Sequence, residues 1–416
     1  MPHTTLPGFR DFYPEQLAER AHVMRAWREV AWRYGFVEYD GPPLEPLELY
    51  TAKSGDEIVG QLYNFTDKGG REIALRPEMT PTFARMVGAR ANSLRKPTRW
   101  FSMPQLFRYE RQQKGRLREH YQLNVDIVGE AGIAADAELI ACAIDICREL
   151  GLSASEVVVR LSDRRVMQAY LRALGIRDDA WATVFTVVDK LARQPRDVSA
   201  EKLATAGLDQ PQIDAVLAMP DTSIETLRDA LAGGDDAAHV AEVDRLFEYV
   251  AALVPSGVEW LRFDLSIVRG LAYYTGTVFE LFDRSGEFRA ICGGGRYDQL
   301  LAALGNASLP ALGFGMGDVV LTELLRARGL LPAHEPLVDY WITSEHDVPL
   351  TAVMNEARRL RSDGFSVEFS LRTQSVPKQR KSARAAGAQR LLHLSRAPDG
   401  EIVAVAPSPT PDSVDG

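Results

Sequence analysis

Cysteine is scarce in this chain of 416 residues, which holds only Cys142, Cys147 and Cys292. The number is odd, and no two of them form a Cys-x-x-Cys pair, so neither a disulfide framework nor a cysteine-based zinc site is indicated. The seven histidines are scattered, without a His-x-x-x-His pair. We therefore expect a protein of a reducing compartment that has no structural zinc.

Long apolar runs are also missing. No stretch approaches the roughly 20 apolar residues that a membrane-spanning helix needs. The first residues, Met1 to Thr5, lack the basic and then apolar pattern of a secretory signal. These absences predict a cytoplasmic location.

Positive charge is in deficit overall, with a net charge of −9, which argues against a general nucleic-acid binder. The charge is uneven, however, because residues 371–396 contain no acidic side chain. The basic residues of this stretch are Arg372, Lys378, Arg380, Lys381, Arg384, Arg390 and Arg396. They predict either a local patch that binds a polyanion or simply a solvated helix face.

What is present is typical of a globular protein of two to three domains, with 46% hydrophobic and 25% charged residues. Apolar residues recur at helical spacing over 19–34 and over 136–150. Between these helices, residues 106–110 and 120–127 alternate as strands, and the second strand turns Gln122, Asn124 and Asp126 to one face. The connection between the two strands, 111–118, is basic and suited to contacting phosphates.

The remainder divides by pattern. Residues 163–256 are helical and predict an inserted helical domain. A Pro-rich linker at 332–336 precedes alternating strands and helices over 337–406, which indicate a small α/β domain with a mainly parallel sheet. We expect the residues from 407 onward to be disordered, because Pro, Ser and Asp dominate there.

Two motifs carry the strongest chemical signal, residues 269–280 and 292–298. Their glycines allow a backbone to approach a ligand closely, Arg269 and Arg296 offer guanidinium groups to anions, and Tyr273 and Tyr274 offer aromatic walls with hydroxyl tips. The motifs predict the lining of a small-molecule pocket, and two core strands joined by a Gly-rich turn are the alternative.

Together the motifs resemble those of class II aminoacyl-tRNA synthetases, and specifically the histidyl-tRNA synthetase family in its divergent bacterial and plant-organelle branch. Residues 8–14 resemble the N-terminal signature, 19–34 with 41–45 resemble motif 1, and 107–118 resemble motif 2. Residues 75–80 resemble the family's Arg-Pro-Glu strand, and 269–280 and 293–298 its histidine motifs.

The resemblance implies an α+β fold, in which a class II antiparallel sheet of six or seven strands is flanked by helices. Residues 1–162 and 257–331 would form the catalytic domain and 163–256 the helical insertion domain. Residues 337–406 would form an anticodon-binding-like α/β domain and 407–416 a disordered tail. Motif 1 implies a homodimer.

The implied reaction is activation of histidine by ATP, accompanied by Mg²⁺, to histidyl-adenylate, and then transfer to tRNA(His). Two arginines match the catalytic cations: Arg108 on the α-phosphate, and Arg269 on the α-phosphate and the histidine carboxylate. Residues matching the ATP site are Arg108, Glu110 and Arg116. Residues matching the histidine site are Glu78, Thr80, Gln122, Asp126, Arg269, Tyr273, Tyr274 and Tyr297. The tRNA contacts would be Gln113, Arg118, Lys378, Arg380 and Lys381.

Three positions depart from the family pattern. Val320 stands where motif 3 commonly has an arginine on the γ-phosphate, so either another cation such as Arg71 or Arg296 takes that role or activation is impaired. Ala272 replaces a common aspartate, and Asp126 replaces the usual glutamate.

Val320 keeps two further functions open. The synthetase-like regulatory subunit of ATP phosphoribosyltransferase binds histidine without charging tRNA, and the missing arginine fits it. The retained Arg269, the motif 2 loop and the C-terminal domain favour the enzyme. A pseudo-synthetase module that binds tRNA or regulates a kinase has only Val320 in its favour.

Overall fold

The computed structural model describes residues 4–54, 56–109, 115, 117–268, 274–305, 307–332 and 338–409. The chain forms two compact units, Met1–Pro332 and Ala333–Gly416. The first unit contains a nine-stranded and a three-stranded sheet, the second a four-stranded sheet, and each unit has a hydrophobic core of its own.

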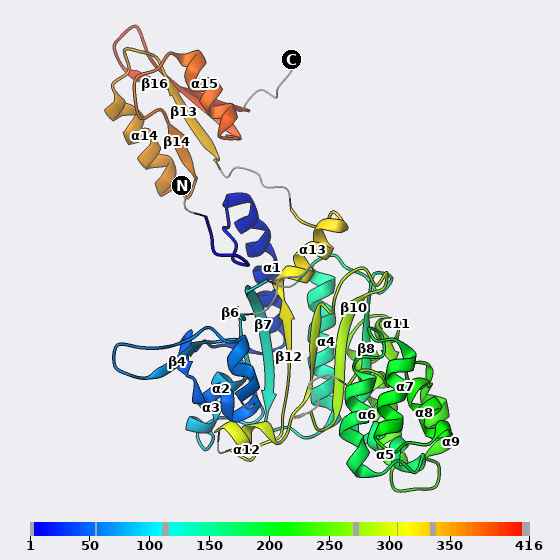
Figure 1. Ribbon diagram of the computed structural model, residues 1–416. Coiled ribbons are helices and arrows are strands. Elements are labelled where there is room, and N and C mark those ends of the chain that lie inside the picture. The colour runs from blue at the N-terminus through cyan, green and yellow to red at the C-terminus, as the bar shows by residue number, and fades with distance from the viewer. Residues whose placement is uncertain are drawn as a thin grey trace. The chain divides into compact units, whose positions relative to one another are not determined.

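The first unit is built on a nine-stranded sheet (Figure 1). Along the sheet the strands are β1 (Val37–Glu38), β5 (Thr98–Ser102), β7 (Glu119–Val128), β12 (Ala311–Gly317), β11 (Cys292–Arg296), β10 (Thr277–Asp283), β8 (Val157–Asp163) and β9 (Leu261–Phe263), while β6 (Gln105–Phe107) pairs with β7 off this path. The run from β5 to β8 is antiparallel throughout. The edge strands β1 and β9 join in parallel. The predicted six or seven strands therefore match the antiparallel centre but undercount the sheet, because β1, β6 and β9 are only two or three residues long.

Helices cover one face of this sheet. Predicted helices 19–34 and 136–150 are confirmed as α1 (Pro14–Arg33) and α4 (Ile133–Glu149), and α13 (Asp318–Ala327) follows β12. Trp27 of α1 and Ile140 of α4 are fully buried in one core with Leu123 and Val125 of β7. The alternation of β7 explains this arrangement, since its apolar residues face the helices and leave the polar residues for the other face.

The other face is bordered by a three-stranded sheet and by short helices. The strands are β2 (Leu44–Pro46), β4 (Glu72–Leu75) and β3 (Asn64–Thr66), and the helices are α2 (Glu48–Ser54), the 3₁₀ helix η1 (Asp56–Gln61), α3 (Thr80–Arg90) and α12 (Leu300–Gly305). Phe83 of α3 and Leu301 of α12 pack in a second core with Tyr274, Val278 and Tyr297.

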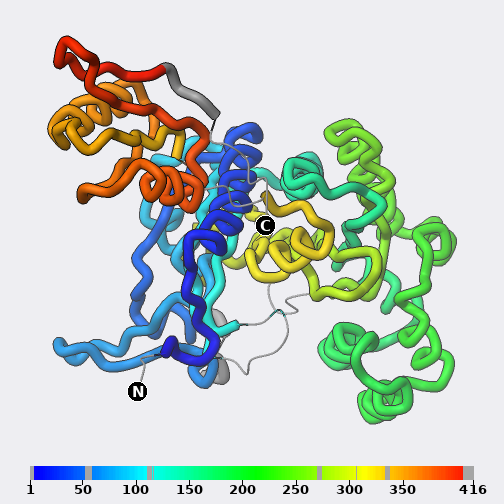
Figure 2. The backbone as a smooth tube through the Cα atoms, turned by 90° about the horizontal axis from the view of Figure 1, so that it is seen from above, coloured from blue at the N-terminus to red at the C-terminus, as the bar shows by residue number. Residues whose placement is uncertain are grey.

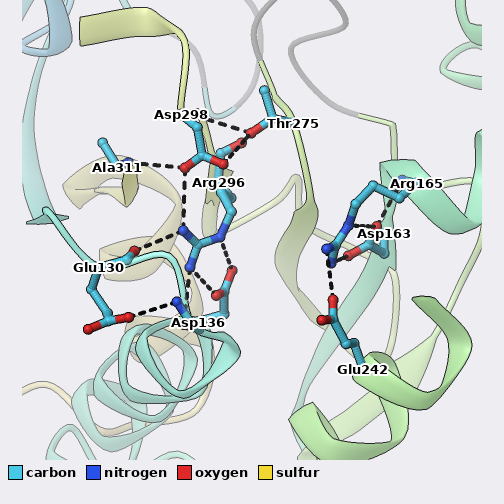
Figure 3. Close-up of polar contacts among 10 residues, drawn as sticks. Glu130, Asp136, Asp163, Arg165, Glu242, Thr275, Arg296, Asp298 and Ala311 are labelled. Carbon is cyan, nitrogen blue, oxygen red and sulfur yellow. Dashed lines mark hydrogen bonds and ion pairs between the residues drawn. The ribbon is translucent and has the colours of Figure 1, made fainter. Parts of the chain in front are cut away.

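The predicted helical segment 163–256 is indeed helical, as the green part of Figure 2 shows. Its helices are α5 (Arg164–Ala173), α6 (Trp181–Val188), α7 (Arg196–Thr205), α8 (Gln210–Leu217), α9 (Ile224–Ala230) and α10 (Ala237–Leu253), with the 3₁₀ turns η2 (Asp178–Ala180) and η3 (Met219–Asp221). The short helix α11 (Gly257–Trp260) follows the segment and leads into β9. Arg165 connects the segment to the sheet, because it forms ion pairs with Asp163 of β8 and Glu242 of α10, both at 2.7 Å (Figure 3). None of the helices in the described part of the chain is both long and apolar enough to cross a membrane.

The second unit has a four-stranded sheet in the order β14 (Val367–Phe369), β13 (Tyr340–Ser344), β15 (Arg390–Arg396) and β16 (Ile402–Pro409). The first three strands are parallel, as predicted, and β16 is antiparallel to β15. α14 (Leu350–Ser362) packs on the face of Tyr340 and Ile342, and α15 (Val376–Ala385) on the face of Trp341 and Leu391.

The predicted disorder from residue 407 is wrong for residues 407–409. They complete β16, in which Ser408 pairs with Leu391 and Pro409 with Arg390. The prolines misled the prediction, because proline is compatible with the edge strand of a sheet. Residues 410–416 lie outside the described residues.

Candidate functional site

A cavity of about 1110 Å³ lies on the face of the main sheet that α1 and α4 leave open. Its floor is formed by β7, β12 and β11, and two kinds of residue alternate across it. β7 contributes His120, Gln122, Asn124 and Asp126, whereas β11 and β12 contribute Gly293, Gly313, Gly315 and Gly317. The alternation of residues 120–127 predicted this polar face, and the structure confirms that a cavity lies over it.

The glycines are needed because polar side chains from β7 lie across them. A Cβ at Gly313 would be 2.0 Å from Oδ1 of Asp126, and a Cβ at Gly315 would be 2.6 Å from Nε2 of Gln122. Real atoms do not approach so closely. The two glycines therefore make room for the Asp126 and Gln122 side chains in the floor of the cavity.

Asp126 and Tyr297 line the cavity at one end of the floor strand β7 and both are buried, with 5% and 3% exposure. The Tyr297 hydroxyl donates a hydrogen bond to Oδ1 of Asp126. Burial raises the pKa of Asp126 to about 7, although the hydrogen bond from Tyr297 opposes that rise. Tyr274 also lines this part of the cavity. A carboxyl group among phenols can bind a small heterocycle that has both a donor and an acceptor nitrogen.

A row of hydrogen bonds runs along β7 from this end. Nε2 of Gln122 donates to Oδ1 of Asn124 at 3.0 Å, and Nε2 of His120 lies 3.3 Å from Oε1 of Gln122. Because an amide oxygen only accepts, Nε2 of His120 carries the proton. Burial and the positive charge of Arg108 lower the pKa of His120 to about 4, so its ring is neutral at pH 7. Sequence reasoning did not name His120, although the strand alternation put it on the face of Gln122.

Arg108 brings a fixed positive charge to the same cavity, directly after β6. Its Nε donates to the carbonyl of Pro77 at 2.9 Å, which orients the guanidinium. The same segment then supplies Glu78 and, at the start of α3, Thr80, and both line the cavity. The cavity thus brings together the predicted residues Glu78, Thr80, Arg108, Gln122, Asp126, Tyr274 and Tyr297.

Other predicted site residues are not in this group. Glu110, Gln113, Arg116, Arg269 and Tyr273 lie outside the described residues, as does Ala272. Arg118 is described and does not line the cavity, and its guanidinium lies 4.4 Å from the ring centre of Tyr109.

Neither of the two suggested substitutes for the missing motif 3 arginine lines the cavity. Arg296 is buried, forms ion pairs with Asp136 and Asp298, and donates to the carbonyl of Glu130 at 3.0 Å (Figure 3). Its role is to fix the strand end before Tyr297. Arg71 is an exposed side chain that forms an ion pair with Asp67 at 2.7 Å.

The Gly-Asp-Val-Val sequence at the start of α13 has a structural explanation. Asp318 is buried, forms an ion pair with Arg10 at 2.9 Å and accepts a hydrogen bond from the amide of Tyr121 at 2.9 Å. Arg10 also binds Glu119 at 2.6 Å. Val320, two residues later, lines the cavity. An anion bound in the cavity next to the start of α13 would thus contact the apolar side chain of Val320.

Sequence reasoning also missed several arginines that line the cavity. Arg289 precedes β11, Arg160 and Arg262 lie on β8 and β9, and Arg193 and Arg196 come from the helical insertion. No local pattern in the sequence brings these positions together. Within the part of the chain that the structure describes, no cluster of three or more His, Cys, Asp or Glu residues could hold a metal ion.

An antiparallel sheet covered by helices on one face, with an arginine-containing, glycine-floored cavity on the other, is the catalytic fold of class II aminoacyl-tRNA synthetases. Residues 8–318 match the family model described as Histidyl-tRNA synthetase. The chain belongs to the histidyl-tRNA synthetase family.

Curated relatives agree with this assignment. A protein of Opitutus terrae named histidine–tRNA ligase is 45% identical over 400 residues, which cover 95% of this chain and 91% of that protein. A chloroplastic/mitochondrial histidine–tRNA ligase of Arabidopsis thaliana is 39% identical over 390 residues, covering 94% and 79%. The solved histidyl-tRNA synthetase of Nostoc sp. PCC 7120 shares the fold with a TM-score of 0.82, at 22% identity and with coverage of 98% and 97%.

Proposed function

We propose that this chain activates L-histidine with ATP to form histidyl-adenylate and then transfers the histidyl group to tRNA(His). The observation that carries the proposal is that Arg108 and the buried Asp126–Tyr297 pair share one cavity. The family membership and the ligase names of relatives with 39 and 45% identity support the same function.

The chemistry requires cations around the ATP phosphates. In the first step an oxygen of the histidine carboxylate bonds to the α-phosphorus, the bond from that phosphorus to the bridging oxygen of the β-phosphate breaks, and pyrophosphate leaves. In the second step the oxygen of a ribose hydroxyl at the end of the tRNA bonds to the histidyl carbonyl carbon, the bond from that carbon to the phosphate oxygen of AMP breaks, and AMP leaves as the hydroxyl proton is released. Arg108 is suited to the first step, because its guanidinium stays charged, is already oriented by Pro77 and can bind two phosphate oxygens.

Recognition of the histidine side chain is assigned to Asp126 and Tyr274. A carboxyl group and a phenol can bind the two imidazole nitrogens and reject side chains that lack this pattern. Glu78, Thr80 and Gln122 are assigned to the substrate ammonium and carboxylate groups, and Tyr297 closes the wall. The roles of Arg269, Tyr273, Glu110 and Arg116 remain predictions from the family resemblance.

The remaining partners follow from the same assignment. Arg118 and Gln113 would contact tRNA near the cavity, and Lys378, Arg380 and Lys381 would contact it through residues 337–406. Magnesium would enter as part of the MgATP substrate, because this ion keeps several waters and binds largely through phosphate oxygens. A homodimer and a cytoplasmic location complete the proposal.

The decisive assay is histidine-dependent exchange of labelled pyrophosphate into ATP by the purified chain, followed by charging of tRNA(His). We expect exchange with histidine and background exchange with the other amino acids. Histidine binding without exchange would instead support the regulatory subunit, which Val320 alone favours. Absence of both binding and exchange would contradict both functions.

A further inference from the structure

We propose that Arg289 binds the β- and γ-phosphates of ATP and stabilises the pyrophosphate as it leaves, at the end of the cavity where Val320 offers no charge. The inference rests on the proposed function, and it assigns the role to an arginine that lines the cavity, which Arg71 and Arg296 do not.

The sheet register brings Arg289 beside the start of α13. The amide of Ile291 donates to the carbonyl of Leu281 at 2.8 Å, and the amide of Gly317 donates to the carbonyl of Ile291 at 3.4 Å. Residues 289–290 therefore enter β11 next to the residues that end β12 and begin α13. Both Arg289 and Val320 line the cavity.

Gly115, from the connection between β6 and β7, lies close to both Val320 and Arg289. A Cβ built on Gly115 would lie 3.3 Å from Cγ2 of Val320 and 3.7 Å from Cδ of Arg289. Both side chains thus lie within 4 Å of one point. Three segments that are far apart in the sequence converge here: the β6–β7 connection, the β10–β11 hairpin and the first turn of α13.

The hairpin that carries Arg289 is held by a buried carboxylate. Asp283, with 1% exposure, accepts hydrogen bonds from the amides of Glu287 and Phe288, both at 3.0 Å. Gly286 supplies the left-handed turn with φ of 72°. The backbone next to Arg289 is therefore fixed before a ligand arrives, which reduces the ordering cost of binding.

Charge complementarity identifies the occupant as a polyphosphate. Arg108 and Arg289 line the same cavity. A chain of phosphates can meet both cations at once. Arg10 does not compete for this role, since it binds Asp318 and Glu119 and does not line the cavity.

The test compares nucleotides that differ only in their terminal phosphates. In calorimetry, Arg289→Gln should weaken ATP binding roughly tenfold or more and leave AMP and histidine binding unchanged, because one charged hydrogen-bonding group is lost. In pyrophosphate exchange, kcat/KM for ATP should fall about 10²-fold. Arg289→Lys should retain part of the affinity, because it keeps the charge but loses the fork.

Two further variants sharpen the result. Arg71→Gln removes an arginine outside the cavity and should bind ATP and AMP as the wild-type chain does. The double variant Arg289→Gln/Val320→Arg should regain ATP affinity over Arg289→Gln alone, since it returns a cation to the same end of the cavity.

Wild-type ATP affinity in Arg289→Gln would overturn the inference, and so would equal losses for ATP, AMP and histidine, which would indicate a structural role. A wild-type chain without exchange would contradict the proposed enzyme. The difference between ATP and AMP affinities would still test Arg289, so the two failures are distinguishable.

Discussion

Asp126 places a buried titratable group in the wall of the cavity. Its carboxyl accepts a hydrogen bond from Tyr297 and packs directly against the backbone of Gly313, which has no side chain. Burial dominates its titration and raises its pKa from 3.8 to about 7. Asp126, which is one methylene shorter than the glutamate common in the family, thus bonds to the Tyr297 phenol and stays buried.

This shift predicts a pH-dependent stability. The folded protein holds the Asp126 proton more tightly than the unfolded chain does, so ionisation of Asp126 costs folding free energy. The cost grows as the pH rises from about 4 to about 7 and is constant above that range. Asp126→Asn removes the cost. We compare the free energies of unfolding of the variant and the wild-type chain by urea denaturation. The advantage of the variant should be larger at pH 8 than at pH 5 by roughly 2 to 3 kcal/mol.

A matched control is Asp229→Asn, which changes an exposed aspartate on α9. Its free energy of unfolding should follow that of the wild-type chain across the same pH range. Parallel pH profiles for Asp126→Asn and wild type would contradict the raised pKa.

At the scale of elements, strand β12 shows how a sheet can serve as a binding surface. Its residues Gly313, Gly315 and Gly317 alternate with Phe314 and Met316, which are buried in the core on the helix side. Polar side chains of β7 fill the space over the first two glycines. One strand therefore packs the core and the neighbouring strand supplies the chemistry.

We expect Gly313→Ala to disturb both the site and the fold. Its Cβ would lie 2.0 Å from Oδ1 of Asp126 and 2.8 Å from the carbonyl oxygen of Val125, so Asp126 must move. The free energy of unfolding should fall by about 1–3 kcal/mol, and histidine affinity by calorimetry should fall at least tenfold, which is about 1.4 kcal/mol.

Gly317→Ala on the same strand is the control for stability, since a Cβ at Gly317 meets nothing within 4 Å. Its free energy of unfolding should stay at the wild-type value. Unchanged histidine affinity in Gly313→Ala would show that the position of Asp126 does not determine binding.

Elements also show what the sequence could and could not predict. The alternation of β7 and the apolar spacing of α1 and α4 are local, so the polar face over the sheet and the helices behind it could be predicted from them. Strands β1 and β9 are too short to leave a pattern. The role of Arg296 and the place of Arg289 depend on partners distant in sequence, Asp136 and Val320, and no local spacing reveals such contacts.

At the scale of the whole molecule, the acid-free stretch 371–396 belongs to the second unit, while the cavity belongs to the first. Within the second unit α15 presents Lys378, Arg380, Lys381 and Arg384 as exposed side chains. Gln379 between them is buried and exchanges hydrogen bonds with the backbone of Ser344 at 2.9 and 2.8 Å. The Gln379 amide and the apolar contact with Trp341 thus hold the helix on the sheet, and its cations remain available to a polyanion.

This arrangement predicts that tRNA binding and amino-acid activation can be separated. Reversing the charge in Lys378→Glu/Lys381→Glu should weaken tRNA(His) binding about tenfold or more. It should also reduce the slope of log affinity against log salt by about 2, because two phosphate contacts are lost. Histidine-dependent pyrophosphate exchange should be unchanged, since neither lysine lines the cavity.

The control is Arg358→Glu, which changes an exposed residue of α14 on the opposite face of the small sheet. This variant should leave tRNA affinity near the wild-type value. Loss of exchange together with tRNA binding in Lys378→Glu/Lys381→Glu would contradict the separation. If Arg358→Glu weakened tRNA binding as much as the double variant does, only the net charge of this unit would matter and α15 would have no specific role.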